Sequence, residues 1–434
     1  MSKKHTVPRG CADIAPPEIY HWQTLEYALR DVLQAYNYQE IRTPIFEDTE
    51  LFARSMGQSS DVVMKQMLNL ASQRPSEDGH PRLSGLSLRP ENTASVVRSY
   101  IQQGLDRRES LTKLFYLGPM FRGERPQKGR LRQFHQVGVE AIGPHAQSPF
   151  LDAEVVALSA DMLQAAGIKE FVININTLGS VEDKENFSGW LRQQLGARLD
   201  ELDEEDRGRF DRNVFRVLDS KSAATRKVVG SIDMQQFKLS TDSQAYFEQV
   251  LKALDRLKIT YRVDPTLVRG LDYYTHTVYE ITSSALGSQD ALGAGGRYNR
   301  LVSQLGGPDV GAVGFALGLE RILLALNPKD DAVQNGPAVF VIAFDEDSFE
   351  RAWEATSLLR RAGIRADMAY QVGSVKSLMR QANKSGAAQT VILGKDELAR
   401  GVVGLKDMAS GEQQDVSIGS NDYQQLIEIL KERL

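Results

Sequence analysis

The 434-residue chain has only one cysteine, Cys11, which excludes an internal disulfide and a cysteine-based zinc cluster. A lone thiol is typical of a reducing compartment, so we expect a cytoplasmic protein. The six histidines show no HExxH or other paired spacing, so the sequence predicts no metal site of its own. No run approaches the roughly 18 apolar residues of a membrane span, and no apolar segment of a signal peptide follows the basic N-terminal residues.

Two common phosphate-binding loops are also missing. The sequence contains no GxxxxGK[ST] motif. The glycine cluster GAGG at 293–296 lacks the third glycine of GxGxxG, because Tyr298 stands at that position. Taken alone, the cluster predicts only a tight turn.

Net charge is small, because 52 Lys and Arg residues oppose 57 Asp and Glu residues, giving −5. This balance argues against a general nucleic-acid coat, although local clusters of Lys and Arg can still bind nucleic acid. With 41% apolar and 25% charged residues, the composition is that of an ordinary globular protein. The length predicts about three domains.

One stretch organises the chain, Phe121–Gly143, with the sequence FRGERPQKGRLRQFHQVGVEAIG. Its loop at 122–132 has a single acid, Glu124, among five basic residues: Arg122, Arg125, Lys128, Arg130 and Arg132. This density of cations predicts a phosphate-binding loop. The alternative is a solvated hairpin tip.

The strand after this loop is expected to carry a site. Because side chains alternate along a strand, one face receives Phe134, Gln136 and Glu140, and the other receives apolar residues such as Val137 and Val139. An ordinary half-buried strand would leave only scattered charge on its polar face. An aromatic ring, an amide and a carboxylate in a row beside a cationic loop predict the floor of a binding site.

Three further segments place polar residues unexpectedly. RPENT at 89–93 sets Glu91 and Thr93 before a helix, where they would serve equally well as helix caps. RGLDYYT at 269–275 would also suit a strand whose tyrosines pack into a core. Arg321 lies in the first turn of an apolar helix and opposes its dipole, which is explained if the helix N-terminus and Arg321 share an anion.

Two of these segments, together with a third at 41–46, resemble the class II aminoacyl-tRNA synthetases. Phe121–Glu124 with the following strand is similar to motif 2 of that class. GFALGLERILL at 314–324 is similar to motif 3, which carries Arg321. Ile41–Phe46, with its Pro44, is similar to motif 1, the strand through which these enzymes dimerise.

Two other segments narrow the resemblance to the histidyl-tRNA synthetases. RGLDYYT at 269–275 and GAGGRY at 293–298 are similar to the two signatures of that family. The similarity begins near Arg9 and continues to the C-terminal region. That region resembles the anticodon-binding domain shared with threonyl-, prolyl- and glycyl-tRNA synthetases.

The resemblance implies a ligase that activates L-histidine with ATP to histidyl-adenylate and pyrophosphate. It would then transfer histidine to the 3′-terminal adenosine of tRNA(His). Magnesium would accompany the ATP phosphates. Arg122 and Arg269 are the implied catalytic residues, because both would contact the α-phosphate as its charge grows. The implied ATP-binding residues are Arg122, Glu124, Arg130, Phe134 and Arg321, with adenine stacked on Phe134.

The family pattern also implies a histidine pocket. In it, Glu140 and Tyr274 would hold the imidazole, which needs a hydrogen-bond donor and an acceptor on opposite sides. Glu91 and Thr93 would bind the α-ammonium group, and Gln136 would bind the backbone end of the ligand. The full implied set is Glu91, Asn92, Thr93, Gln136, Glu140, Arg269, Tyr273, Tyr274 and Tyr298.

The implied fold is mixed α/β (α+β), with a class II antiparallel-sheet catalytic core flanked by helices. Its catalytic core would comprise residues 1–177 and 259–328. A mainly helical insertion domain at 178–258 would interrupt this core, consistent with the acid-rich, helix-forming composition there. A linker at 329–337 would lead to an α/β anticodon-binding domain at 338–434, where strand and helix patterns alternate.

We expect a homodimer formed through the motif 1 region, because Pro44 favours an edge strand. Three alternatives remain from the sequence. A non-catalytic regulatory relative, partnering the first enzyme of histidine biosynthesis, would lack the C-terminal domain and the phosphate-binding arginines. Another class II synthetase would not carry RGLDYYT, and a simple RNA-binding module would not need Gln136, Glu140 and Tyr274 together.

Overall fold

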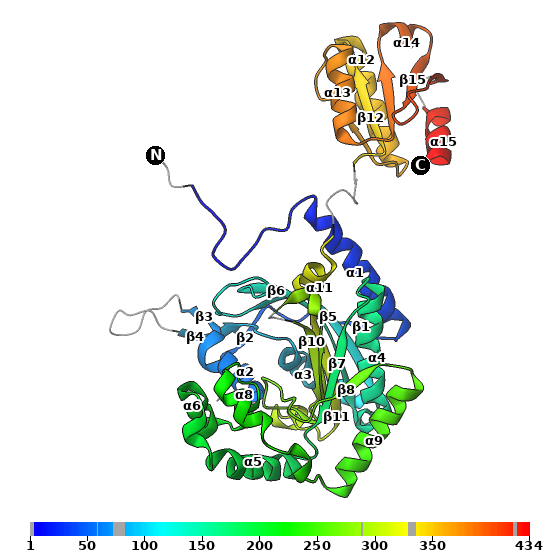
Figure 1. Cartoon of the computed structure of the whole chain (residues 1–434). Helices are drawn as coiled ribbons and strands as arrows, with labels where there is room; N and C mark the ends of the chain where they lie inside the picture. Colours follow the sequence, from blue (N-terminus) through cyan, green and yellow to red (C-terminus); the bar gives the residue numbers. More distant parts are fainter. Residues whose placement is uncertain (1–3, 59, 73–82, 288–289, 329–335, 420–422) are drawn as a thin grey trace. The chain divides into compact units, whose positions relative to one another are not determined.

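The computed structural model describes residues 4–58, 60–72, 83–287, 290–328, 336–419 and 423–434. The chain divides into two compact units, Met1–Pro328 and Lys329–Leu434. Each is drawn in Figure 1 and is described here by itself. The predicted linker at 329–337 lies outside the described residues except for Gly336 and Pro337.

Within the described ranges, the first unit is built on an eight-stranded sheet with the order β1-β5-β6-β11-β10-β9-β7-β8. The bounds are β1 Gln39–Glu40, β5 Thr112–Phe121, β6 Gln133–Gly143, β7 Val172–Thr177, β8 Tyr261–Val263, β9 Thr275–Thr282, β10 Ala291–Arg297 and β11 Gly311–Gly318. Only the edge strands β1 and β8 pair in parallel, and every inner pair is antiparallel. The predicted antiparallel core is therefore confirmed.

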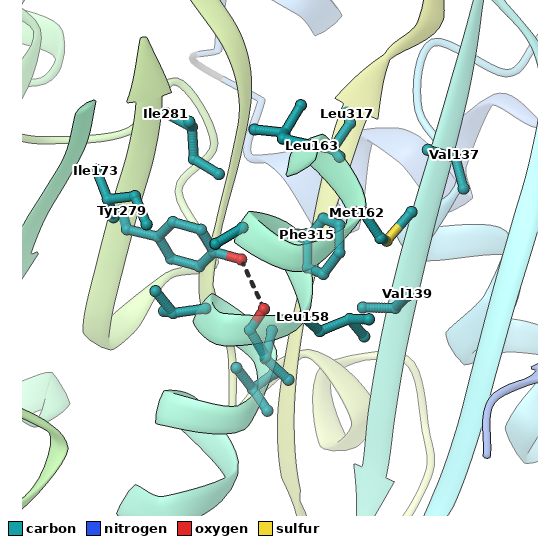
Figure 2. Close-up of a cluster of buried hydrophobic side chains, with 14 of the residues drawn as sticks. Val137, Val139, Leu158, Met162, Leu163, Ile173, Tyr279, Ile281, Phe315 and Leu317 are labelled. Carbon is teal, nitrogen blue, oxygen red and sulfur yellow. Dashed lines mark hydrogen bonds between the residues drawn. The ribbon is translucent and has the colours of Figure 1, made fainter. Parts of the chain in front are cut away.

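One face of this sheet packs on helices. The helices are α1 Glu18–Ala35, α4 Pro149–Ala165 and α9 Thr241–Arg256. Helices α1 and α9 each bury an apolar stripe, whereas α4 is buried on nearly all sides. Figure 2 shows side chains of β6 and β11 meeting those of α4, and the Tyr279 hydroxyl donating to the Val155 carbonyl. Val137 and Val139 are fully buried in this cluster, as the alternation along the strand predicts.

The opposite face carries a second apolar cluster and the polar residues. It is covered by α2 Thr49–Met56 and α3 Thr93–Gln102. Residues between Phe46 and Leu88 also form a three-stranded sheet with the order β2-β4-β3. Its bounds are β2 Phe46–Asp48, β3 Leu68–Ala71 and β4 Leu83–Leu88. The motif 1 strand expected at Ile41–Phe46 does not form as one strand: β1 ends at Glu40 and lies at a sheet edge, and β2 begins only at Phe46, after Pro44.

The glycine cluster does not form a tight turn, so that part of the sequence prediction is wrong. Gly293, Gly295 and Gly296 lie within strand β10, between β9 and β11. A Cβ atom on Gly295 would stand 2.5 Å from the Gly314 carbonyl oxygen, and one on Gly293 would stand 2.4 Å from a Leu317 methyl group. Glycine is needed here because the neighbouring strand approaches too closely for a side chain.

Residues 178–258 are helical, as predicted. Before α9 the bounds are α5 Val181–Gly196, α6 Glu204–Arg212, α7 Phe215–Leu218 and α8 Ala223–Gly230. Their apolar residues form a small core of their own, which includes Phe187, Leu191 and Val217. The first unit ends with α10 Leu301–Gln304 and α11 Leu319–Leu326.

The second unit alternates strands and helices, as its sequence pattern predicts. Its sheet has the order β13-β12-β14-β15-β16. The bounds are β12 Val339–Ala343, α12 Glu346–Arg361, β13 Ala366–Met368, α13 Val375–Ser385, β14 Gln389–Leu393, α14 Lys395–Ala399, β15 Val402–Asp407, β16 Gln413–Ser417 and α15 Gln424–Arg433. Across the described parts of both units, no helix is long and apolar enough to cross a membrane.

Candidate active site

A large cavity of about 1100 Å³ opens on the polar face of the main sheet. Strands β6, β10 and β11, the loop at 122–132 and the loop at 264–274 contribute to its walls. All but one of the site residues predicted from the sequence line it: Glu91, Thr93, Arg122, Glu124, Arg130, Phe134, Gln136, Glu140, Arg269, Tyr273, Tyr274, Tyr298 and Arg321. The structure therefore brings together residues from four distant segments.

Strand β6 forms the floor of this cleft. Phe134, Gln136 and Glu140 all line the cavity, so the predicted polar face of the strand is confirmed. Among the described residues, the Oε1 atom of Gln136 is buried and has no hydrogen-bond partner. A buried acceptor of this kind suits a ligand that brings a donor, such as an ammonium group.

Glu140 is the most deeply buried acid of the floor, with 1% of its surface exposed. Thr93 Oγ1 donates to one carboxylate oxygen at 2.7 Å, and the Tyr298 hydroxyl donates to the other. Burial raises the pKa of Glu140 to about 8, although both donated hydrogen bonds oppose that rise. This carboxyl group can therefore gain or lose its proton near neutral pH.

Glu91 both caps helix α3 and lines the cleft, the two roles that its position in the sequence allowed. Its carboxylate accepts hydrogen bonds from the backbone N–H groups of Thr93, at 2.7 Å, and Ala94, at 3.0 Å, and so satisfies the N-terminus of α3. The same side chain lines the cleft. Burial raises its pKa, and the backbone donors hold that rise back.

Asn92 lies outside the cleft, and this departs from the implied histidine-binding set. Its side-chain oxygen accepts hydrogen bonds from the hydroxyl of Thr43 at 2.7 Å and from Arg89 at 3.2 Å. Asn92 is fully buried at the N-cap position of α3. Asn92 is therefore absent from the lining of the cavity to which its neighbours Glu91 and Thr93 contribute.

Three tyrosines form an aromatic wall. The rings of Tyr273 and Tyr274 lie 4.6 Å apart, and those of Tyr273 and Tyr298 lie 5.5 Å apart. Burial raises the pKa of Tyr274 to about 12, so its hydroxyl remains a donor at neutral pH. Sequence reasoning missed a fourth, Tyr116, which lines the cleft from β5 and stands opposite Gly138 in the ladder. The one sequence signal for Tyr116 is Gly138 on the neighbouring strand, because a glycine leaves room for a ring opposite it.

The arginines gather where the 122–132 loop approaches α11. Arg122 Nε donates to the Pro90 carbonyl at 2.9 Å, and its guanidinium carbon lies 5.1 Å from the centre of the Phe134 ring. Arg130 Nη1 lies 3.5 Å from Glu124 Oε2, within the distance of an ion pair. Arg321 leaves the first turn of α11 and donates to the carbonyls of Gly129 at 3.1 Å and Ala291 at 2.6 Å.

Arg122 and Arg321 lie in an environment that disfavours positive charge. Burial lowers the pKa of Arg321, and the nearby charge of Arg130 lowers it further. Burial also lowers the pKa of Arg122, with Arg130 again adding to the decrease while Glu124 and Glu91 oppose it. A phosphate group would relieve this repulsion, so this end of the cleft suits an anion.

Arg269 lies in the loop before β9 and not at the start of a strand, because β9 begins only at Thr275. Arg269 Nη1 donates to Glu280 at 2.7 Å. Burial lowers the pKa of Arg269, but Glu280, Tyr274 and Asp219 together raise it above its usual value. Glu280 lines the cleft and was missed, although a lone acid in the apolar strand THTVYEIT is a signal for it.

Comparison with known proteins identifies the family. Residues 10–322 match the family model of histidyl-tRNA synthetase, and residues 338–433 match that of an anticodon-binding domain. The histidine–tRNA ligase of Halothermothrix orenii is 43% identical over 415 residues, covering 95% of this chain and 97% of that protein. The one from Lysinibacillus sphaericus is 44% identical over 416 residues, covering 95% and 96%.

A solved structure agrees with these relatives. The apo histidyl-tRNA synthetase of S. aureus superposes with a TM-score of 0.77 at 34% identity, covering 99% of this chain and all of that one. The fold is therefore that of a class II synthetase. The chain belongs to the histidyl-tRNA synthetase family, and its function is the aminoacylation of tRNA(His).

Proposed function

We propose that the cleft on the polar face of the main sheet carries out this ligase reaction. The observation that supports the proposal best is the division of one cavity into two ends. At one end lie Arg122, Arg130 and Arg321, where burial, together with the nearby charge of Arg130, lowers the pKa values of Arg122 and Arg321. At the other end, the buried carboxylate of Glu140 accepts a hydrogen bond from Tyr298, and Tyr274 also lines the cavity. One end suits ATP and the other suits an imidazole.

ATP is proposed to bind along the arginine end. Phe134 would stack on the adenine and Glu124 would lie beside it, while Arg130 and Arg321 would bind the terminal phosphates. Magnesium would enter with the ATP. The carboxylates of Glu124 and Glu280 line the cleft and can offer it oxygen ligands, and the ion would neutralise charge on the phosphates.

Histidine is proposed to bind over β6. Glu140 and Tyr274 would hold the two ring nitrogens, one as acceptor and the other as donor. Glu91, Thr93 and Gln136 would bind the α-ammonium and carboxylate end, where the buried Oε1 of Gln136 needs a donor. Tyr298, which already bonds Glu140, would keep that carboxylate oriented.

Adenylate formation follows from this arrangement. The histidine carboxylate attacks the α-phosphorus, a new P–O bond forms, and the bond to the pyrophosphate oxygen breaks. Arg122 and Arg269 would stabilise the negative charge that builds on the α-phosphoryl oxygens. In the second step a hydroxyl of the 3′-terminal adenosine attacks the histidyl carbonyl and AMP leaves.

The domain roles form part of the proposal. Residues 1–177 and 259–328 would be the catalytic core, 178–258 an insertion domain, and 338–434 the domain that binds the anticodon of tRNA(His). A homodimer is proposed through the motif 1 region, where Ile45 and Phe46 are 45% and 47% exposed. We place the enzyme in the cytoplasm, which its single cysteine suits.

Pyrophosphate exchange with ATP, measured for each standard amino acid in turn, tests the site. We expect exchange with histidine alone. Arg321→Ala should raise the KM for ATP at least about tenfold, because a buried charge-assisted contact with phosphate would be lost. An exposed arginine of the same loop, Arg125, provides the matched Arg125→Ala control. Exchange with a different amino acid, or equal effects of both variants, would contradict the proposed site.

A further inference from the structure

The loop that carries Arg269, Tyr273 and Tyr274 is held by side chains from the helical segment 178–258. Lys184, on α5, donates from Nζ to two backbone carbonyls of this loop. The distances are 2.6 Å to Asp272 O and 2.9 Å to Tyr274 O. These carbonyls belong to the residues on either side of Tyr273.

Two further contacts come from the α6–α7 region. Asn213 Nδ2 donates to Oδ1 of Asp272 at 3.0 Å, and Asn213 Oδ1 accepts from the N–H of Phe215 at 3.1 Å. Arg216, on α7, donates from Nη2 to the Gly270 carbonyl. The helical segment therefore reaches the loop at alternate residues, 270, 272 and 274.

Apolar packing joins the same two parts. Phe215 and Leu218 pack against the small core of the helical segment and also against the cluster that contains Tyr273 and Tyr274. Buried carbonyl groups need partners, and the loop lies between β8 and β9 without strand pairing of its own. The helical segment supplies the hydrogen bonds that a neighbouring strand would otherwise provide.

Lys184 supports the backbone of the loop but does not line the cleft. Its ammonium group bonds the backbone behind two tyrosines that do line it. Hydrogen bonds from a charged donor are about twice as strong as those between neutral groups. A displacement of Lys184 would thus be transmitted to Tyr273 and Tyr274 through the main chain.

We propose that Lys184, Asn213 and Arg216 are positioning residues, which fix the loop at 267–274 so that Tyr274 and Arg269 face the cleft. Arg216 itself lines the cleft, whereas Lys184 and Asn213 act on the loop from outside that lining. This inference rests on the proposed roles of Tyr274 in histidine binding and Arg269 in adenylate formation.

Kinetics of pyrophosphate exchange with Lys184→Met test the inference. We expect kcat/KM for histidine to fall at least about tenfold, since an active-site displacement of about 1 Å can reduce a rate a hundredfold. The KM for ATP should stay within about twofold, because other segments, including the 122–132 loop, hold the nucleotide. Lys227→Met, an exposed lysine of the same helical segment, is the matched control and should match the wild type.

Amide hydrogen exchange gives a readout other than activity. Peptides covering 267–274 should exchange faster in Lys184→Met, while those of β6 should not change. Asn213→Ala removes one neutral hydrogen bond and should produce the same pattern more weakly, so the test does not depend on a single variant. Wild-type kinetics and wild-type exchange in both folded variants would overturn the inference.

Tyr274→Phe and Arg269→Ala, measured in the same assays, separate this inference from the proposed site. If neither alters pyrophosphate exchange with histidine, the proposed roles of the loop fail. If both reduce it while Lys184→Met leaves it unchanged, only the positioning role of the helical segment falls.

Discussion

Replacing Glu140 with glutamine should weaken histidine binding while making the empty protein more stable. Glu140 is fully buried, accepts hydrogen bonds from Thr93 and Tyr298, and has a pKa of about 8. Glutamine keeps the shape of the side chain and its acceptor oxygen but removes the charge. A residue retained only for folding would not change these two properties in opposite directions.

The binding effect follows from the loss of a charged hydrogen bond. Such a bond contributes about 1.5–3 kcal/mol, so the Kd for histidine in Glu140→Gln should rise by roughly 10- to 150-fold. Isothermal titration calorimetry at pH 8.5, where Glu140 is mostly ionised, measures this directly. Glu154→Gln provides the control, because Glu154 pairs with Lys113 away from the cleft and should leave the Kd unchanged.

The stability effect depends on pH in a defined direction. A carboxyl group whose folded pKa is raised destabilises the folded state only where it would otherwise be ionised. The penalty is therefore absent below pH 4.5, grows up to about pH 8 and is constant above that, at most on the order of 5 kcal/mol. Glu140→Gln lacks this penalty at every pH.

Urea unfolding at pH 5 and pH 8.5 measures the effect. The free energy of unfolding of Glu140→Gln, relative to the wild type, should increase by at least about 2 kcal/mol between the two pH values. We set this below the upper limit because part of the penalty is already present at pH 5. A variant that is destabilised equally at both pH values, or that binds histidine normally, would refute the reasoning.

Three other predictions concern the phosphate end and the second unit. Arg269→Ala should slow adenylate formation at least about a hundredfold in stopped-flow measurements, with a much smaller loss of histidine affinity; an unchanged rate would remove Arg269 from the reaction. Glu280→Gln, which loses the ionic partner of Arg269, should slow the same step roughly tenfold while Glu280→Asp retains more activity, and equal rates for all three forms would contradict its orienting role. Deleting 338–434 should preserve pyrophosphate exchange but impair tRNA charging, so normal charging would leave this unit without its proposed function.

Local periodicity was enough to predict the floor of the site. Because side chains alternate along a strand, Phe134, Gln136 and Glu140 had to share one face, and all three line the cleft. The same pattern placed Val137 and Val139 in the core beneath them. A rule with a period of two residues needs no knowledge of the rest of the fold.

Features set by distant neighbours were not predictable in this way. The glycines at 293–296 signal a turn locally, but the close approach of β11 fixes them as a strand. Asn92 lies between two cleft residues in the sequence, yet its side chain accepts a hydrogen bond from Arg89 and does not line the cleft. The bonds from Lys184 to the loop span nearly ninety positions and follow no sequence pattern.

The two ends of the cleft share a physical condition, since each holds charge that burial disfavours. Burial lowers the pKa of Arg122 and raises that of Glu140, so at each end burial opposes the charged form of a group in the cleft. Strand β6 contributes to the floor at both ends, and its opposite face is anchored in a dry apolar core by Val137 and Val139. That packing stabilises the fold independently of the site, so in the proposed function the charged groups would be oriented before ATP and histidine bind. The two ligands would then supply the opposite charges and further hydrogen bonds.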